Sequence, residues 1–227
     1  METPESNRVA KALGESAFGT VRPGEAPTSE ALWAAVGRTR GVIEALLPGI
    51  GFLVVYTLTQ DLVWSVSAPL AVAVGFIFAR LLQKSPLMPA LAGLVGIAAS
   101  AGVALWSGRA EDNFLLGFLV NGLWVAGLLV SLAVRRPLVG VFAAVLVGDE
   151  SWRSDPATRR VATSATWLWV GVFSARLAVQ LPLYFAGQVS ALALAKLMMG
   201  IPLYAAALWF TWLLMRAVYR GREAKAQ

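Results

Sequence analysis

Six runs of about 20 apolar residues, separated by short polar segments, constrain this chain more than any other feature of its sequence. A helix rises about 1.5 Å per residue, so each run is long enough to cross the ~30 Å hydrocarbon core of a bilayer. We therefore predict an all-α, polytopic membrane protein with six transmembrane helices in three hairpins. The expected spans are Gly41–Thr59, Leu62–Leu82, Pro86–Trp106, Phe114–Val134, Val161–Ala186 and Val189–Tyr219.

The composition agrees with a membrane domain and limits the chemistry. Hydrophobic residues make up 58% of the 227 residues and charged residues only 14%, against about a quarter charged in soluble domains. The sequence contains no cysteine and no histidine, which excludes disulfides, thiolate or imidazole metal sites, and Ser-His or Cys-His catalysis. It also lacks a phosphate-binding glycine loop and a Gly-x-Ser-x-Gly elbow. We expect a non-enzymatic protein with no catalytic residue, metal or cofactor.

The basic residues mark alternate connections between the spans. They precede the first span and follow the second, fourth and sixth, whereas the other connections carry few charges. The marked residues are Arg38, Arg40, Arg80, Lys84, Arg135, Arg136, Arg153, Arg159, Arg160, Arg216, Arg220, Arg222 and Lys225. Basic loops stay on the cytoplasmic side of a membrane, so we expect both termini to be cytoplasmic in a bacterial plasma membrane. The net charge of +6 is explained in this way without nucleic-acid binding.

The remaining segments flank or interrupt the spans. Residues 1–28 are polar and are expected to form a flexible cytoplasmic tail, followed by an interfacial helix at 29–40. The transmembrane domain is expected at 41–219 and a basic cytoplasmic tail at 220–227. Within 137–160, the apolar run Pro137–Gly148 is too short to cross a bilayer. It is expected to be a short interfacial or re-entrant helix on the cytoplasmic side, and a plain loop is the alternative.

Arg176 is the most unusual residue inside the predicted spans. It stands about 15 residues into the fifth span, roughly 22 Å along the helix. A central arginine costs about 2.5–3.5 kcal/mol to insert, so it should face protein or water. It shares one helical face with the other polar and aromatic residues of that span. That face contains Thr166, Trp169, Phe173, Arg176, Gln180 and Tyr184.

Two interpretations of this face remain open. Arg176 and Gln180 are either structural contacts between helices or a site for a ligand or anion. Lys196 in the sixth span either extends to the outer interface or joins the same site. Acceptors considered for the two cations are Asp61, Glu111, Asp112, the carbonyls of Ala178 and Met198 freed by Pro182 and Pro202, and a bound anion. Candidate ligand-binding residues are Arg176, Gln180, Lys196, Asn121 and Tyr184.

A second charged group lies near the cytoplasmic boundary of the first span. Glu44 is about one helical turn inside that boundary, close to Arg40 and within expected reach of Arg80. We expect a structural ion pair that joins the first two spans, and a proton or ion relay is the alternative. The cytoplasmic basic face is expected to contain Arg135, Arg136, Arg153, Arg159 and Arg160, where it would contact an anionic lipid or a membrane protein partner. No sequence feature defines an oligomeric state.

Several motifs resemble an actinobacterial family of integral membrane proteins, the domain of unknown function 3159. They include GVIEALLPGIGFLVVY, ARLLQ, RRPLVG, SWRSDPATRR and GIPLY, and the resemblance covers roughly Gly41–Tyr219. More distantly, the order of basic pair, Pro-Leu, short segment, tryptophan and two final spans is similar to the bacterial intracellular septation protein family. That resemblance implies a role in the cell envelope. It implies no catalytic residues.

Two functions follow as hypotheses. The first is a non-enzymatic plasma-membrane protein that acts in cell-envelope maintenance through lipid or protein partners at its basic face. The second is a transporter or channel for a small, potentially anionic, solute with a polar path around Arg176 and Lys196. The surroundings of Arg176 distinguish the two hypotheses. A continuous water-filled cavity that reaches Arg176 would favour the second, and a dry core in which carbonyls satisfy Arg176 would favour the first.

Overall fold

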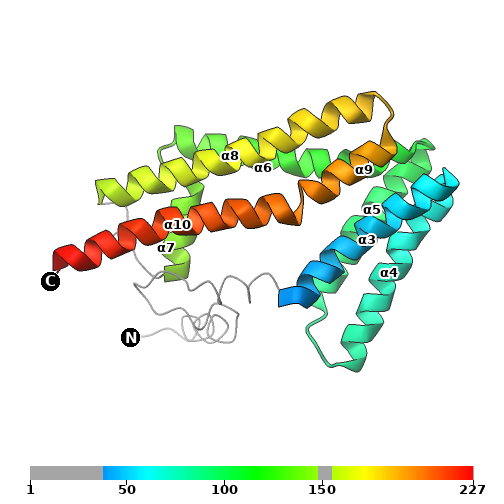
Figure 1. Ribbon diagram of the computed structural model, residues 1–227, viewed down its shortest axis with the longest axis horizontal. Coiled ribbons are helices and arrows are strands. Elements are labelled where there is room, and N and C mark those ends of the chain that lie inside the picture. Colours follow the sequence, from blue (N-terminus) through cyan, green and yellow to red (C-terminus); the bar gives the residue numbers. More distant parts are fainter. Residues whose placement is uncertain (1–37, 148–154, 227) are drawn as a thin grey trace. The chain divides into compact units, whose positions relative to one another are not determined.

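The computed structural model describes residues 38–147 and 155–226 of the chain. Helices and one short 3-10 turn account for all of the regular structure in these two ranges. In chain order they are α3 (Arg38–Thr59), α4 (Leu62–Leu82), α5 (Met88–Ser107), the turn η1 (Ala110–Phe114), α6 (Leu115–Ala133), α7 (Leu138–Val147), α8 (Pro156–Phe185), α9 (Val189–Met198) and α10 (Ile201–Ala226) (Figure 1).

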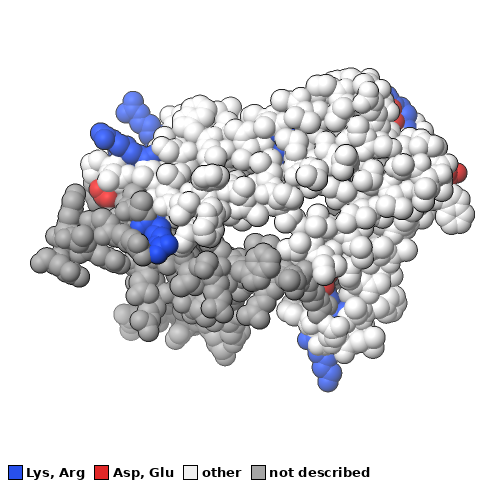
Figure 2. Space-filling model, viewed as in Figure 1, with Lys and Arg blue, Asp and Glu red and all other residues white. Residues whose placement is uncertain are grey.

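Six segments of this structure are long and apolar enough to cross a membrane, which confirms the all-α fold with six spans. The share of each segment that is buried inside the protein is low, from 11% to 28%. Large apolar side chains therefore cover the outer faces of the helices, as a lipid environment requires. In Figure 2 the visible charged residues lie mainly at helix ends, and the flanks between them are almost entirely uncharged.

Several helix boundaries differ from those expected. The fifth span begins at Pro156, because Asp155 caps the helix by accepting a hydrogen bond from the Thr158 amide (3.2 Å). The fourth span begins with the turn η1 at Ala110. The short apolar segment forms a true helix, α7. The helix expected at 29–40 lies outside the described residues except for 38–40, which belong to α3, and α10 continues past Tyr219 to Ala226.

The largest difference is in the sixth span, which is two helices and not one. Helix α9 ends at Met198 and α10 begins at Ile201. Met199 and Gly200 connect them, with the Met199 amide bonded to the Ala195 carbonyl (2.9 Å) and the Gly200 amide to the Leu197 carbonyl (3.1 Å). A new series of bonds starts where the Tyr204 amide donates to the Gly200 carbonyl (3.0 Å).

The described residues divide into two compact units. Unit 1 contains 126–147, 155–171 and 205–226, and unit 2 contains Arg40–Val125 and Val172–Tyr204. In unit 1, the Ser131 hydroxyl accepts a hydrogen bond from the Leu138 amide at the start of α7 (3.3 Å). The Thr166 hydroxyl of α8 lies 3.4 Å from the next amide, that of Val139. These bonds hold the first turn of α7, which runs across the direction of α8 in Figure 1.

Unit 2 has an aromatic and aliphatic core at the end where α3, η1 and α9 meet. Phe52 packs edge-on against Phe114, with ring centroids 5.5 Å apart, and Leu192 of α9 is fully buried in the same cluster. Gly49 allows α3 to approach α9 closely, since a Cβ atom there would lie 2.8 Å from a methyl carbon of Leu197. This packing fixes α9 as a short independent helix before the break.

Candidate functional site

The break in the sixth span follows from its local sequence. Pro202 is the second residue of α10, where the missing amide hydrogen is tolerated. In an unbroken helix the same proline would remove a bond to the Met198 carbonyl and clash with it. Gly200 fits because a Cβ atom there would lie 3.0 Å from the Lys196 carbonyl oxygen and 3.2 Å from that of Leu197. The Gly-Ile-Pro sequence therefore interrupts the helix.

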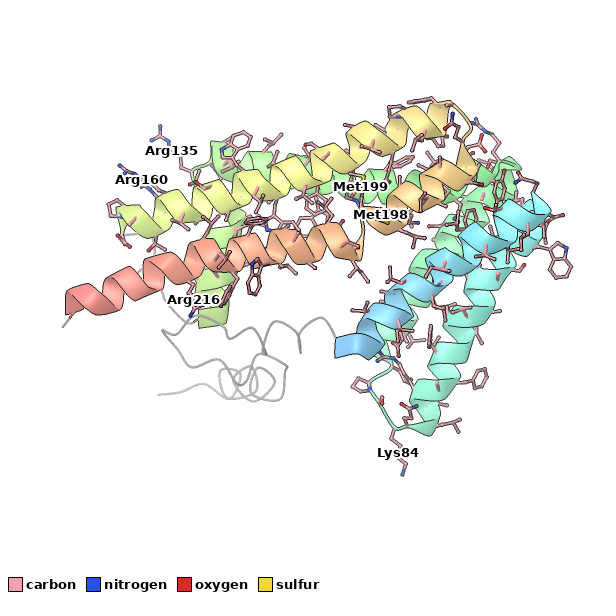
Figure 3. All side chains as sticks on the ribbon, viewed as in Figure 1. Lys84, Arg135, Arg160, Met198, Met199 and Arg216 are labelled. Carbon is pink, nitrogen blue, oxygen red and sulfur yellow. The ribbon has the colours of Figure 1, made fainter. Side chains whose placement is uncertain are left out.

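Arg176 of α8 lies at this break. Its Nη1 atom donates a hydrogen bond to the carbonyl oxygen of Met199, the residue that follows α9. Figure 3 labels Met199 at the junction of α9 and α10. The guanidinium also lies over the ring of Tyr204, with 4.8 Å between Cζ and the ring centroid, which is a favourable cation–π distance. The expectation that Arg176 faces protein is met, because only 7% of its surface is exposed.

Arg176 and the Met199 carbonyl lie at similar distances from the turn that connects α8 and α9. Arg176 precedes the end of α8 at Phe185 by nine residues, which is about 14 Å along the helix. Met199 follows the start of α9 at Val189 by ten residues, or about 15 Å. Only the short turn at 186–188 separates these helices. If that turn lies at the membrane surface, the guanidinium and the break both lie near the middle of a ~30 Å hydrocarbon core.

The polar face of α8 is satisfied at both of its ends. Toward the N-terminus, Thr166 donates to the Ala162 carbonyl (2.8 Å), and the indole nitrogen of Trp169 donates to the Thr211 hydroxyl (3.1 Å). Toward the C-terminus, the Tyr184 hydroxyl donates to Asp112 Oδ1 (2.7 Å). The bonds of Trp169 and Tyr184 anchor the face to α10 and η1, and Thr166 is satisfied within α8.

The middle of the same face is not satisfied. Among the described residues, the buried side-chain nitrogen and oxygen atoms that lack a hydrogen-bond partner are Arg176 Nε and Gln180 Nε2. Gln180 lies one helical turn from Arg176 and is only 2% exposed. Both atoms are donors, so what is missing is a group that accepts hydrogen bonds. Leaving such a buried donor unpaired costs about 1–3 kcal/mol.

Aromatic rings pack near Arg176 within unit 2. Phe173, one turn before Arg176, stacks on Trp124 of α6 with ring centroids 5.8 Å apart. Phe173 also packs against Tyr204, at 5.9 Å. Through Phe173, the rings of Trp124 and Tyr204 therefore link α6 and α10 to the face of α8 that carries Arg176.

The acidic residues considered as partners for Arg176 and Lys196 are engaged elsewhere. Glu111 Oε1 accepts hydrogen bonds from Arg109 Nη2 (2.8 Å) and Nε (3.0 Å). Asp112 is bound by Tyr184, and Asp61 caps α4 by accepting from the Trp64 amide (3.1 Å). The acceptor of Arg176 is instead a backbone carbonyl, that of Met199, one residue beyond the Met198 carbonyl that the position of Pro202 suggests.

The other residues named from the sequence do not all join this site. Lys196 lies over the Phe114 ring, with Nζ 5.0 Å from the centroid. Tyr184 is bonded to Asp112. Asn121 of α6 is buried, and among the described side chains no hydrogen bond joins it to Arg176. The structure thus brings together Arg176 and Gln180 and adds two partners that the sequence analysis missed, the Met199 carbonyl and the Tyr204 ring. The Gly-Ile-Pro sequence was the available signal for both.

Glu44 and Arg80 form an ion pair between α3 and α4. Arg80 Nε lies 3.0 Å and Nη2 2.5 Å from the same carboxylate oxygen, Glu44 Oε2. The remaining nitrogen, Nη1, donates to the Pro86 carbonyl (2.7 Å) in the connection to α5. The side chains are 15% exposed for Arg80 and 12% for Glu44. The side chain of Arg40, proposed as a third member, lies outside the described residues.

The basic residues of unit 1 lie around the ends of α6 and α8. Arg135, Arg136, Arg159 and Arg160 are exposed, and Arg135 and Arg160 extend outward from the ribbon in Figure 3. Arg135 follows α6 in the left-handed region (φ 55°), where its amide bonds to the Leu132 carbonyl (3.0 Å). Arg153, also assigned to this face, lies outside the described residues.

The six apolar helices, together with a buried polar pair at a helix break, define a multi-pass membrane protein. The chain belongs to the family described as "Protein of unknown function (DUF3159)", whose match covers residues 36–221. No curated protein and no solved structure matches the chain. The family includes all six spans and the candidate site, and its description assigns no activity to them.

Proposed function

We propose that this protein is a non-enzymatic membrane protein that moves a small solute across a bacterial plasma membrane. The observation that carries the proposal is the interrupted sixth span with Arg176 of the fifth span at the interruption. In secondary transporters, broken helices present backbone groups and half-helix ends to a substrate near the middle of the membrane. Here no described residue forms a hydrogen bond with Arg176 Nε or with Gln180 Nε2.

The lack of an enzymatic role rests on the sequence. The sequence contains no histidine and no cysteine. Catalysis by a nucleophile that an imidazole activates, or by a cysteine thiolate, is therefore excluded. The guanidinium of Arg176 and the amide of Gln180 would bind a solute, and the Met199 carbonyl and the Tyr204 ring would orient the guanidinium. The assignment to a plasma membrane and the orientation in it are inferred from the positions of the basic residues. In this orientation both termini and α7 are on the cytoplasmic side.

Proteoliposomes test the transport function directly. Liposomes that contain the wild-type protein are diluted into phosphate, succinate or mannitol, so that the solute is more concentrated outside than inside. The rate of swelling as the solute enters is followed by light scattering. At least one solute should enter faster than it enters protein-free liposomes, and Arg176→Leu should remove the difference. The control is Lys84→Leu, which removes an exposed cation of unit 2 and should leave the rate unchanged. Equal rates for wild-type and empty liposomes with all three solutes would contradict the proposal.

The orientation is tested separately with reporters. A reporter fused after Gln227 and one inserted near Ser154 should be cytoplasmic, and one inserted near Ala110 should be outside. An external reporter at Ser154 would overturn the six-span orientation, because the connection between the fourth and fifth spans carries the most basic residues.

A second role, in cell-envelope maintenance, is favoured by the basic end of unit 1. Arg135, Arg136, Arg159 and Arg160 are exposed, and no carboxylate of the described part of the chain forms an ion pair with them. Such clusters attract anionic lipid headgroups by about 1 kcal/mol per residue. If this is the partner, replacing all four with glutamine should reduce the thermal stabilisation by phosphatidylglycerol over phosphatidylcholine nanodiscs. Lys84→Gln is the control, and an unchanged stabilisation in the fourfold variant would exclude this role.

A further inference from the structure

Among the residues that the structure describes, no carboxylate forms an ion pair with the guanidinium of Arg176. The two ion pairs between described residues are Arg80 with Glu44 and Arg109 with Glu111, and neither involves Arg176. Its neighbours, the Met199 carbonyl and the Tyr204 ring, carry only partial negative charge. A buried cation without an anion is strongly unfavourable, because the desolvation cost is not returned by a full opposite charge. The charge balance at the break therefore favours an anion.

One edge of the guanidinium is buried and lacks a hydrogen-bond partner among the described residues. Nη1 is bonded to the Met199 carbonyl, and the opposite edge contains the unpaired Nε. That edge, formed by Nε and Nη2, is the one that binds carboxylate and phosphate oxygens in pairs. Because the carbonyl and the ring already fix the plane of the guanidinium, little conformational entropy remains to be lost when an anion binds.

Gln180 supplies a second donor on the same side of α8. Its amide nitrogen is buried and unpaired, one turn from Arg176. A cation would be repelled by the guanidinium, and an apolar ligand would leave both donors unsatisfied. An oxyanion satisfies Nε, the amide and the net charge together. The burial of both side chains further restricts the ligand to a small group.

We infer that Arg176 and Gln180 bind one small oxyanion, a carboxylate or a phosphate, at the break between α9 and α10, while the Met199 carbonyl and the Tyr204 ring hold the guanidinium in place. This inference specifies the ligand class for the site on which the proposed transport function rests. It does not require that the anion be released on the other side. The anion is either a free solute or the headgroup of a lipid that reaches the break.

Thermal unfolding of the full-length protein tests the inference. The protein is purified in a neutral detergent with chloride as the only anion, and unfolding is followed by the fluorescence of its nine tryptophans. Phosphate and succinate are then titrated at constant ionic strength, and phosphatidylglycerol or phosphatidylcholine is added in separate samples. A ligand that binds only the folded state raises the melting temperature as its concentration passes Kd. Phosphate or succinate is expected to produce a saturable rise.

Two variants at the site and one away from it make the result specific. Gln180→Met has a similar shape but no donor, so its melting temperature without anion should be equal to or above that of the wild type. Its apparent Kd should be at least about tenfold weaker, the factor that a lost charge-assisted hydrogen bond of about 1.4 kcal/mol produces. Arg176→Lys keeps the charge but loses the planar edge, and should weaken binding further. Lys84→Arg, at an exposed position after α4, should titrate like the wild type.

Each outcome decides a separate question. A rise with phosphatidylglycerol alone that Gln180→Met abolishes identifies a lipid headgroup as the oxyanion. No rise with any of these anions, or an equal rise in Gln180→Met, overturns the inference. Anion-dependent stabilisation without flux in proteoliposomes would retain the binding site and refute transport. Flux of mannitol without anion-dependent stabilisation would retain transport and refute the oxyanion site.

Discussion

The ion pair between Glu44 and Arg80 should contribute measurably to the stability of unit 2. Two guanidinium nitrogens contact one carboxylate oxygen, at 3.0 and 2.5 Å, and both side chains are at least 85% shielded from solvent. Hydrogen bonds to charged groups contribute about 1.5–3 kcal/mol each, and desolvation of both ions offsets part of this gain. We expect a net coupling of about 2 kcal/mol.

A double-mutant cycle isolates this coupling. Glu44→Gln, Arg80→Gln and the double variant are unfolded reversibly in mixed micelles by increasing the fraction of SDS, with tryptophan fluorescence as the signal. Each single variant should lose about 2–3 kcal/mol of unfolding free energy, because the buried charge that remains loses its partner across α3 and α4. The bond from Arg80 to the Pro86 carbonyl is lost in both the single and the double Arg80 variants, so it cancels in the cycle.

The pair of Arg109 and Glu111 is the matched control. Its contact distance is similar, at 2.8 Å, but the Arg109 side chain is 55% exposed. Solvent screening should make its coupling much smaller than that of Glu44 and Arg80. A coupling below about 0.5 kcal/mol for Glu44 and Arg80, or equal couplings for the two pairs, would refute the argument from burial.

Three further predictions concern the break, the end of α8 and the position of α7. Gly200→Ala should lower the melting temperature, because the new Cβ atom would press on two backbone oxygens. Gly96→Ala is the control and should not lower it, since the space beside Gly96 is open. Equal melting temperatures for the two variants would show that the break relaxes freely. Tyr184→Phe should cost about 1–3 kcal/mol in the same SDS assay by leaving the buried Asp112 carboxylate without this donor, and no loss would mean that water replaces the hydroxyl. A cysteine in place of Phe142, which is 54% exposed on α7, should react with a membrane-impermeant maleimide from the cytoplasmic side only, and labelling from outside would show that α7 crosses.

The spans could be predicted from the sequence because their signal is local. A run such as Leu62–Leu82 has the required length and hydropathy whatever its neighbours do, and the structure gives the same bounds for α4. The helical face of Arg176 was also predictable, since a spacing of three and four residues determines which side chains share a face. Its burial follows from the cost of exposing a guanidinium to lipid.

The partners of Arg176 could not be derived in the same way. No charged residue lies between Leu197 and Leu203, so by length and hydropathy the sixth span is one continuous apolar segment. Gly200 and Pro202 favour a break locally, but the side chain that satisfies the freed carbonyl comes from a neighbouring helix, and this is a tertiary effect. Likewise, Asp112 was a plausible partner for a cation by depth alone, but its bond to Tyr184 depends on how η1 packs against α8.

The contact between Arg176 and Met199 also has a consequence for how the chain enters the membrane during synthesis. Arg176 leaves the ribosome 23 residues before the carbonyl that it binds, so α8 alone must carry an unpaired guanidinium. A central arginine raises the cost of insertion by about 2.5–3.5 kcal/mol. Integration of α8 should therefore await α9, so that the last hairpin partitions from the translocon as a pair. A nascent chain that stops at Gln188 is expected to integrate its fifth span poorly, and one extended past Tyr204 should do so efficiently.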